Sequence, residues 1–416
     1  MMRGKSLLVL ALLIFACTGP QGASAQLPKI PRIPTRPKPQ PTPAAQPAPA
    51  ANSQPAPQPA PAANNNTNAQ AAAAGADQPA LMYDSLQVTA WTNNSYKGSY
   101  DVWSWTPRMK FRVWGPVPSG SQLYVTFQKP GGGAAPWMTF DCETQETQKN
   151  YWRETECGGR KVEDKSITEV GPVNFSIKMR NELQGTDVTV FSGRMKVART
   201  LSNEHGPKAA NKFVYYVDHD WNLPIGYVFY TPDSVYNWDY PSFNVAFWVR
   251  GEATGFDPHL YYQGKEIGRV FIGDTQVGKG SCGSVLENAT THFVNEGVPQ
   301  KAKWARVECN FPMVKRWDKT DGGQGQPNTN EMFKMASNPG EYEFKLLWKN
   351  RLARTIKFTV GPDGKLDNGI APANRLGIDR AVVPVTIIGD HDGTWDRTAW
   401  KTEAFYGHPL TGFSAP

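Results

Sequence analysis

The sequence lacks the features of a membrane-spanning, a helical or a nucleic-acid-binding protein. After the N-terminal region, no segment has the roughly 18 continuous apolar residues that a membrane span needs. Helical periodicity is weak, with one short candidate at residues 329–337. The formal net charge is +7, but six of the 44 basic and one of the 37 acidic residues lie in residues 1–80, which leaves 38 against 36. This near balance excludes a nucleic-acid polyelectrolyte.

Catalytic motifs that can be recognised from spacing are also missing. The sequence contains no G-x-S-x-G elbow, no H-E-x-x-H string and no Walker phosphate loop. Four of the six histidines stand singly, namely His205, His259, His292 and His408. Isolated histidines are typical of surface and turn positions. We therefore expect a protein without enzymatic activity.

The N-terminus has the order of parts found in a secretory signal. Arg3 and Lys5 precede an apolar stretch, and small residues ending at Ala25 follow it. This order predicts a signal peptide over residues 1–25 that is cleaved after Ala25. Alternatively, Cys17, directly behind the apolar stretch, is a lipid-modified cysteine that anchors the chain. Either interpretation predicts export to the periplasm, the outer-membrane surface or the extracellular space.

Residues 26–80 consist almost entirely of proline, alanine, glutamine and asparagine. Such a segment has too little apolar surface to compensate for the entropy lost on ordering. We expect a disordered Pro/Ala-rich linker, roughly 150 Å long as polyproline II or about 40 Å as a flexible coil. It would hold the folded part away from the N-terminus.

Past residue 80 the pattern changes to short alternating runs separated by glycine, proline and asparagine. Period-two runs at this spacing predict an all-β fold. Matching strings occur twice: Trp152 and Trp304 each begin a W-x-x-x-E-C string, and an Asp-His-Asp string follows the last strand pair of each copy. We therefore expect two homologous β-sandwich domains, over residues 81–230 and 231–416.

Residues 339–360, two alternating runs around a tight turn, resemble the last hairpin of an immunoglobulin-like domain. The resemblance implies two tandem immunoglobulin-like β-sandwich domains after the signal peptide and linker. It implies no particular site, because this fold serves many functions.

Four cysteines remain if the signal peptide is removed, and an even number in an exported chain indicates disulfides. Because equivalent cysteines of a repeat should pair alike, we predict Cys142 with Cys157 and Cys282 with Cys309. We also expect the tryptophan of each W-x-x-x-E-C string to pack on the disulfide of its domain.

The two Asp-His-Asp strings carry the ligand types of a divalent-metal site, and they give Asp218, Asp220, Asp390 and Asp392 as candidate ligands. On a strand the two aspartates of a string share a face opposite the histidine. The alternative is that these are loop residues whose carboxylates bond local backbone amides. No other cofactor is expected.

All 14 tryptophans follow residue 80. Aromatic side chains in loops or on strand faces can stack on sugars or anchor a protein partner. The candidate contact residues are Trp103, Trp105, Trp137, Trp221 and Trp238. Alternatively, they cover the ends of the sandwiches and the seam between them.

Together these features predict an exported, non-enzymatic binding or structural protein whose partner is an extracellular polysaccharide or a protein. Two alternatives remain. One is a subunit of an envelope or surface assembly, and the other is a metal-dependent envelope enzyme that uses the Asp-His-Asp strings.

Overall fold

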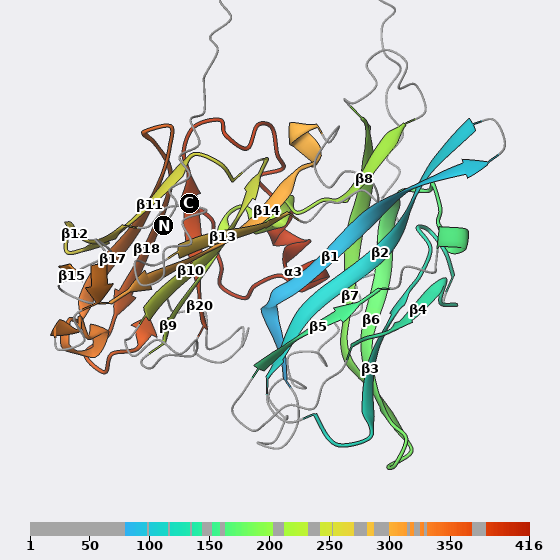
Figure 1. The fold of residues 1–416 in the computed structure, drawn as a ribbon, viewed down its shortest axis with the longest axis horizontal. Coiled ribbons are helices and arrows are strands. Elements are labelled where there is room, and N and C mark those ends of the chain that lie inside the picture. The colour runs from blue at the N-terminus through green and yellow to red at the C-terminus, as the bar shows by residue number, and fades with distance from the viewer. Residues whose placement is uncertain are drawn as a thin grey trace, which may run out of the picture. The chain divides into compact units, whose positions relative to one another are not determined.

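The structure is a computed structural model that describes residues 80–97, 100–114, 117–133, 135–143, 152–158, 163–202, 212–231, 242–251, 253–269, 281–286, 299–313, 317–319, 325–327, 331–367 and 380–416. All of them belong to one compact unit, Ala63–Pro416. The expected signal peptide, Cys17 and the expected linker up to residue 79 lie outside these ranges. The fold is all-β, as predicted, with antiparallel sheets and short helical turns (Figure 1). No helix in the described ranges is long and apolar enough to cross a membrane.

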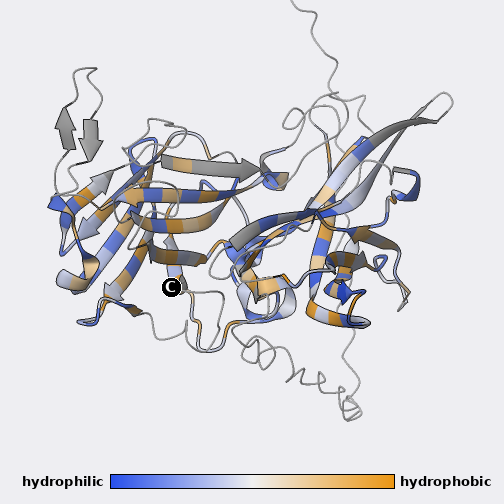
Figure 2. Cartoon of the chain, turned by 60° about the horizontal axis from the view of Figure 1, so that its bottom comes forward, coloured by the Kyte–Doolittle hydropathy of each residue, from blue (hydrophilic) through white to orange (hydrophobic). Residues whose placement is uncertain are grey.

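The first half of the described chain forms two sheets, in the orders β1-β2-β5 and β4-β3-β6-β7-β8. The strands are β1 (Ala80–Lys97), β2 (Tyr100–Trp114), β3 (Ser121–Phe127), β4 (Met138–Asp141), β5 (Trp152–Cys157), β6 (Gly171–Asn181), β7 (Thr186–Leu201) and β8 (Phe213–Val217). Alternation places one face of each strand in the core. In β6, Val173, Phe175 and Ile177 are buried and the residues between them are not. Figure 2 shows this hydrophilic and hydrophobic alternation along the strands.

The second half forms one continuous sheet in the order β12-β11-β17-β18-β20-β9-β10-β14-β13. Its strands are β9 (Ile225–Thr231), β10 (Ser242–Arg250), β11 (Phe256–Tyr262), β12 (Lys265–Arg269), β13 (Ser281–Leu286), β14 (Trp304–Pro312), β17 (Gly340–Trp348), β18 (Arg351–Val360) and β20 (Arg380–Ile387). Short β19 (Leu366–Asp367) pairs with β18, and β15 (Trp317–Lys319) pairs with β16 (Gly325–Pro327). β20 pairs with β18 on one side and with β9 on the other. Side chains from the strands on both sides of β20 form a second apolar core.

The same order of pairing occurs in both halves. The pairing β1-β2-β5 corresponds to β9-β10-β14, and the pairing β4-β3-β6-β7-β8 corresponds to β12-β11-β17-β18-β20. The hairpins β6–β7 and β17–β18 correspond residue by residue, since Gly171 pairs with Val197 and Gly340 with Val360. The register shift follows the seventh residue of the first strand in each, Ile177 or Leu346. A β-bulge at the same place in two hairpins is a further repeated feature.

The structure contains the two predicted disulfides, Cys142–Cys157 and Cys282–Cys309. Each joins neighbouring antiparallel segments: Cys282 faces Cys309 across β13 and β14, and Cys142 forms an isolated bridge with Cys157. Cys282–Cys309 therefore joins two strands of one sheet, whereas Cys142–Cys157 joins the residue directly after β4 to β5, which belongs to the other sheet of the first half. In antibody domains the disulfide also joins two sheets.

The expectation that the tryptophan packs on its disulfide is wrong for Trp304. Trp304 and Cys309 are five positions apart on β14, so their side chains point to opposite faces. Cys309 belongs to the second core, whereas Trp304 belongs to a separate small cluster with Trp248. The side chain of Trp152 lies outside the described part of the chain.

β9, which spans residue 230, pairs with β10 and β20 of the second set of strands. The C-terminal segment, residues 388–416, follows the last strand of the second half but packs on the first. Phe405 and Tyr406 enter the first core, where the Tyr406 hydroxyl bonds the Leu86 carbonyl. Packing of the C-terminal segment therefore holds the two halves together.

Candidate functional site

Both Asp-His-Asp strings lie in connections that follow a strand. Asp218 and His219 lie between β8 and a 3-10 turn, Asp220–Asn222, that leads into β9. The second string lies in turns after β20. Because neither string is a strand, the two-face arrangement expected from alternation does not hold. In the second string, His391 and Asp392 are both buried and Asp390 is exposed.

His219 is completely buried in a group of aromatic rings. Its ring stacks on Trp248 at 4.5 Å between centroids and meets the edges of Trp304 at 5.7 Å and Tyr406 at 6.2 Å. Burial lowers the pKa of His219 to about 3, because the charged imidazole would lose its hydration there. A neutral ring enclosed in this way is part of the packing and does not face solvent.

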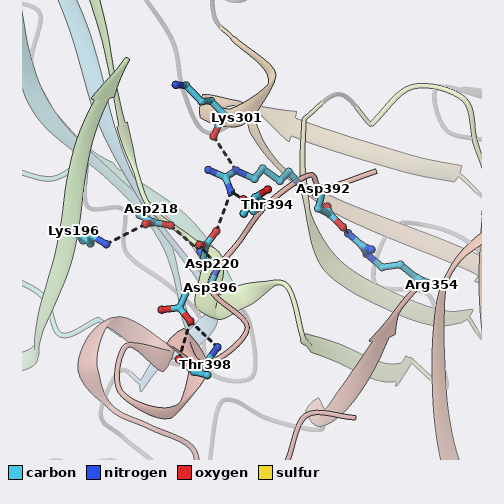
Figure 3. Close-up of polar contacts among 10 residues, drawn as sticks. Lys196, Asp218, Asp220, Lys301, Arg354, Asp392, Thr394, Asp396 and Thr398 are labelled. Atoms are coloured by element: carbon cyan, nitrogen blue, oxygen red, sulfur yellow. Dashed lines mark hydrogen bonds and ion pairs between the residues drawn. The ribbon is translucent and has the colours of Figure 1, made fainter. Parts of the chain in front are cut away.

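Arg250, the last residue of β10, connects the two strings. Figure 3 shows Asp218 and Asp220 of the first string and Asp392 of the second. Nη1 of Arg250 lies 3.5 Å from Oδ1 of Asp220, and the Arg250 backbone N–H donates to Oδ1 of Asp392 at 2.8 Å. Its Nε donates to the Lys301 carbonyl at 2.8 Å and its Nη1 to the Thr394 carbonyl. One arginine thus holds segments that are more than a hundred residues apart in the sequence.

Asp392 makes a buried ion pair with Arg354, whose Nη2 lies 2.6 Å and 2.5 Å from the two carboxylate oxygens. Burial alone would raise the pKa of Asp392. The charge of Arg354 and the hydrogen bonds from His391, Arg354 and the Arg250 amide outweigh it and hold this pKa well below its ordinary value. The Asp392 carboxylate is therefore charged and fully engaged by protein groups.

In the first string, the surroundings of Asp220 disfavour the charged form of its carboxylate. Burial and the neighbouring charge of Asp218 raise its pKa to about 6, although the Asp396 N–H donates to it at 2.7 Å. Asp218 lies 3.5 Å from Nζ of Lys196 and accepts the N–H of Asp220 at 3.1 Å. The latter is the local backbone bond that the alternative interpretation of these strings predicts.

The four aspartates do not gather around one point. Asp392 is ion-paired with Arg354, Asp220 lies beside Arg250, and Asp390 is exposed. Among the residues the structure describes, no group of three histidine, cysteine, aspartate or glutamate side chains could hold a metal ion. Charged hydrogen bonds of Asp220 and Asp392 with Arg250 and Arg354 instead connect the two halves.

Most of the candidate contact tryptophans lie in the core. The exposed fractions are 8% for Trp103, 0% for Trp105 and 5% for Trp221, because opposing strands or the C-terminal segment cover them. Trp137 is half-buried, meets Trp105 edge to face at 5.3 Å and donates its Nε1–H to the Lys165 carbonyl at 3.0 Å. Trp238 lies outside the described residues. The structure therefore brings Trp105 and Trp137 together, but not as an open platform.

An open, partly polar site lies instead on the outward face of β17, β18 and β20, beside the turn that follows β11, and we call it the polar hollow. Its volume is about 390 Å³. Its lining residues are Gln263, Gly264, Glu341, Tyr342, Glu343, Lys357, Phe358, Thr359 and Pro384.

Strand alternation explains the chemistry of the polar hollow. Tyr342 and Phe358 turn inward into the second core, so Glu341, Glu343 and Lys357 turn outward. In the register of the sheet, Glu343 lies directly across from Lys357 on one side. One side of the polar hollow is formed by the two-residue turn between β11 and β12, Gln263 and Gly264. Both residues have positive φ, as the tight turns of β-hairpins require, and this geometry fixes the position of the turn.

Next to the polar hollow, His259 on β11 lies between two carboxylates. Its Nε2 is 3.2 Å from Oδ2 of Asp257, and its Nδ1 is 3.3 Å from Oε1 of Glu266 on β12. Tyr261, two residues on, lies across from Glu343 in the sheet, and Nζ of Lys345 stands 4.4 Å from its ring centre. Sequence reasoning missed this face; the alternation in Phe256–Tyr262 is the signal that could have found it.

Comparison of the chain with protein-family models, curated proteins and solved structures finds no match. What this protein does must therefore be argued from its own residues. The polar hollow is the candidate site, because it is open and its side chains are not all used by the fold.

Proposed function

We propose that this is an exported, non-enzymatic binding protein of the cell envelope or extracellular space that recognises glycans. In this proposal two tandem immunoglobulin-like domains stand on a Pro/Ala-rich linker. The observation that carries it is the polar hollow: an open site of about 390 Å³ whose lining includes the hydrogen-bonding side chains of Gln263, Glu341 and Lys357. That volume falls within the range of roughly 300 to 1,000 Å³ typical of small-ligand sites.

The immunoglobulin-like assignment is supported by the order of strand pairing. Constant-type immunoglobulin domains pair their strands as 1-2-5-4 and 3-6-7. Here the first half pairs as 1-2-5 and 4-3-6-7, with β8 added at the edge, and the second half repeats this order. The differences are that the fourth strand pairs with the third, and that the disulfide of the second half lies within one sheet.

A binding role is favoured over catalysis because the buried titratable groups are already occupied. Asp392 is paired with Arg354, Asp220 lies beside Arg250, and His219 is enclosed by aromatic rings. A general acid or base must reach a substrate proton. These groups serve the packing of the two halves instead.

Export is supported by the two disulfides, which are typical of proteins in oxidising compartments. Mass spectrometry of the protein from its native membrane and medium fractions tests this. A mature chain beginning at Gln26 is expected. Lipid on Cys17 would support the anchored alternative, and a chain that keeps residues 1–25 would contradict export.

Calorimetric titration of the purified mature chain with a panel of envelope and extracellular polysaccharides tests the proposed function. Saturable binding to one class of glycan is the expected result. Absence of heat across the whole panel would overturn glycan recognition.

An assembly subunit is the second candidate, and it is favoured by an apolar hairpin tip. Leu183, in the turn between β6 and β7, and Val188, near the start of β7, are 78% and 46% exposed. Exposed apolar residues that lie close together mark interaction surfaces. Light scattering over a range of concentrations tests this: a rising mass that Leu183→Ser abolishes would support assembly, and a constant monomer mass would exclude it.

A further inference from the structure

The two halves offer an internal comparison for the polar hollow. Because the hairpins β6–β7 and β17–β18 share their register, Asn174 with Arg194 corresponds to Glu343 with Lys357. Both cross-strand pairs lie three residues in from the matching first pair of the hairpin. The outward faces of the two hairpins can therefore be compared position by position.

In the first half, the cation at this position is already bound by the protein's own chain. Nη2 of Arg194 lies 2.9 Å from Oε1 of Glu403, and Nε2 of His408 lies 2.6 Å from the Ser192 carbonyl oxygen. Both partners belong to the C-terminal segment. The neighbouring cation of that face, Lys196, lies beside Asp218. The first copy thus presents cations, and carboxylates of the chain itself, Glu403 and Asp218, pair with them.

In the second half, the corresponding side chains face open space. Within the described part of the chain, the side chains of Gln263, Glu341 and Lys357 make no hydrogen bond or ion pair, and they line the hollow. Glu343 is paired with Lys345, whose Nζ lies 3.1 Å from its Oε2. Hydrogen-bond donors and acceptors without protein partners are what a polar ligand would use.

The charges of the polar hollow favour an uncharged ligand. The lining holds two carboxylates, Glu341 and Glu343, and one ammonium group, Lys357. Lys345, outside the lining, pairs with Glu343 and so reduces the excess of negative charge. An acidic polymer would meet two glutamates where the first copy has Pro172 and Asn174. An alternating set of carboxylate, amide and ammonium groups instead suits a ligand whose every group both donates and accepts, such as a sugar hydroxyl.

We propose that the polar hollow binds a neutral oligosaccharide, roughly two sugar residues of it within the available volume. The carboxylates of Glu341 and Glu343 accept hydrogen bonds from ring hydroxyls, while Lys357 and Gln263 donate to hydroxyl or ring oxygens. Tyr261, across from Glu343, borders this site on β11. This inference rests on the proposed function and specifies its site and ligand class.

The test is calorimetric titration of the mature chain with cellotriose, maltotriose, xylotriose and N-acetylchitotriose. Saturable binding of one of them is expected, and Glu341→Ala and Lys357→Ala should each weaken it about tenfold, as expected for a lost charged hydrogen bond. The matched controls are Glu182→Ala and Lys365→Ala, exposed residues outside the hollow, which should bind like the unaltered chain. Unchanged melting temperatures would show that all four variants fold.

The outcomes separate the site from the function. If a trisaccharide binds and both hollow variants retain full affinity, the site assignment is overturned while glycan recognition stands. If none of the four trisaccharides binds, but a long polysaccharide of the panel does, the hollow is likewise rejected as the site for a short neutral chain. Binding only of a peptide of residues 396–410, which contains Glu403 and His408, would replace the sugar with a segment like the one on the first copy.

Discussion

At the scale of single residues, the molecule depends on a few buried charges. Arg354 and Asp392 are both almost without exposed surface and bond each other through both carboxylate oxygens. Burying such a pair is costly, but removing one partner costs more because it leaves the other charge unpaired. The pair therefore fixes where the chain goes after β20.

We expect Asp392→Asn to lower the free energy of unfolding at neutral pH by about 3 kcal/mol, because Arg354 would remain buried without its counter-charge. The pKa of Asp392 is lower in the folded state, so this contribution is present at neutral pH and is lost only on strong acidification. Urea unfolding followed by circular dichroism measures it. Asp390→Asn, at an exposed residue of the same string, should change stability by less than about 0.5 kcal/mol.

His219 should make the protein less stable in acid. Its pKa falls from 6.5 to about 3 on folding, so below about pH 6.5 the unfolded chain binds a proton that the folded chain does not. Stability should decline by roughly 1.4 kcal/mol per pH unit from this group. Asp220, with its pKa raised to about 6, acts in the opposite sense between about pH 6 and 3.8.

Unfolding of the unaltered chain and of His219→Phe, measured from pH 7 to 4.5, isolates the histidine. The difference in free energy between the two proteins should change by about 2 to 3 kcal/mol over this range. Trp248→Phe, which alters the same packing and keeps the imidazole, should retain the slope of the unaltered chain. Parallel curves for His219→Phe would show that this ring titrates normally.

At the scale of elements, the two equivalent hairpins differ where they meet the rest of the chain. Counting from the paired residues Val197 and Val360, Gly193 of β7 corresponds to Ile356 of β18. Ile356 is fully buried in the second core, next to β20. At Gly193 there is no such space, because a Cβ would lie 2.8 Å from Phe175 and 3.1 Å from Cβ of Tyr406. Glycine here admits the C-terminal segment.

Gly193→Ala should therefore destabilise the protein by about 1 to 3 kcal/mol through overpacking. Thermal unfolding measures the change. The control is Gly133→Ala, since a Cβ at Gly133 would meet nothing within 4 Å. Equal melting temperatures for the two variants would mean that the C-terminal segment does not pack tightly on β7.

At the scale of the whole molecule, residues of the second half pack into the core of the first half. The first core contains residues of both halves: Val88 and Phe175 from the first, and Tyr227, Val382 and Tyr406 from the second. Arg306 of β14 adds a buried ion contact to Asp84 of β1 at 3.9 Å. A shared core of this kind couples the unfolding of the two halves.

We expect the described unit to unfold in one calorimetric transition, because the first core contains side chains of both halves. Tyr406→Ala should lower that transition by removing a ring from the shared core, at a cost of about 3 to 5 kcal/mol. Leu183→Ala, at the exposed hairpin tip, is the control. Two separate transitions in the unaltered chain would contradict the shared core.

The sequence by itself determined the features that are local or repeated. Period-two alternation gave the all-β fold, since side chains on a strand must alternate between core and solvent. The repeat also predicted the disulfides, because in each half the first cysteine lies beside the strand that carries the second, β5 or β14. Parity on β14 could also have placed Trp304 away from Cys309.

Only the tertiary structure decided which faces are covered. Trp105 is buried because residues distant in the sequence pack over it, while Glu341 and Lys357 stay open because nothing described lies on that face. Asp220 and Asp392 became parts of one network through Arg250, which no local pattern connects to either. Contacts between segments far apart in the chain set burial and charge pairing, and a periodicity read along one strand contains no information about them.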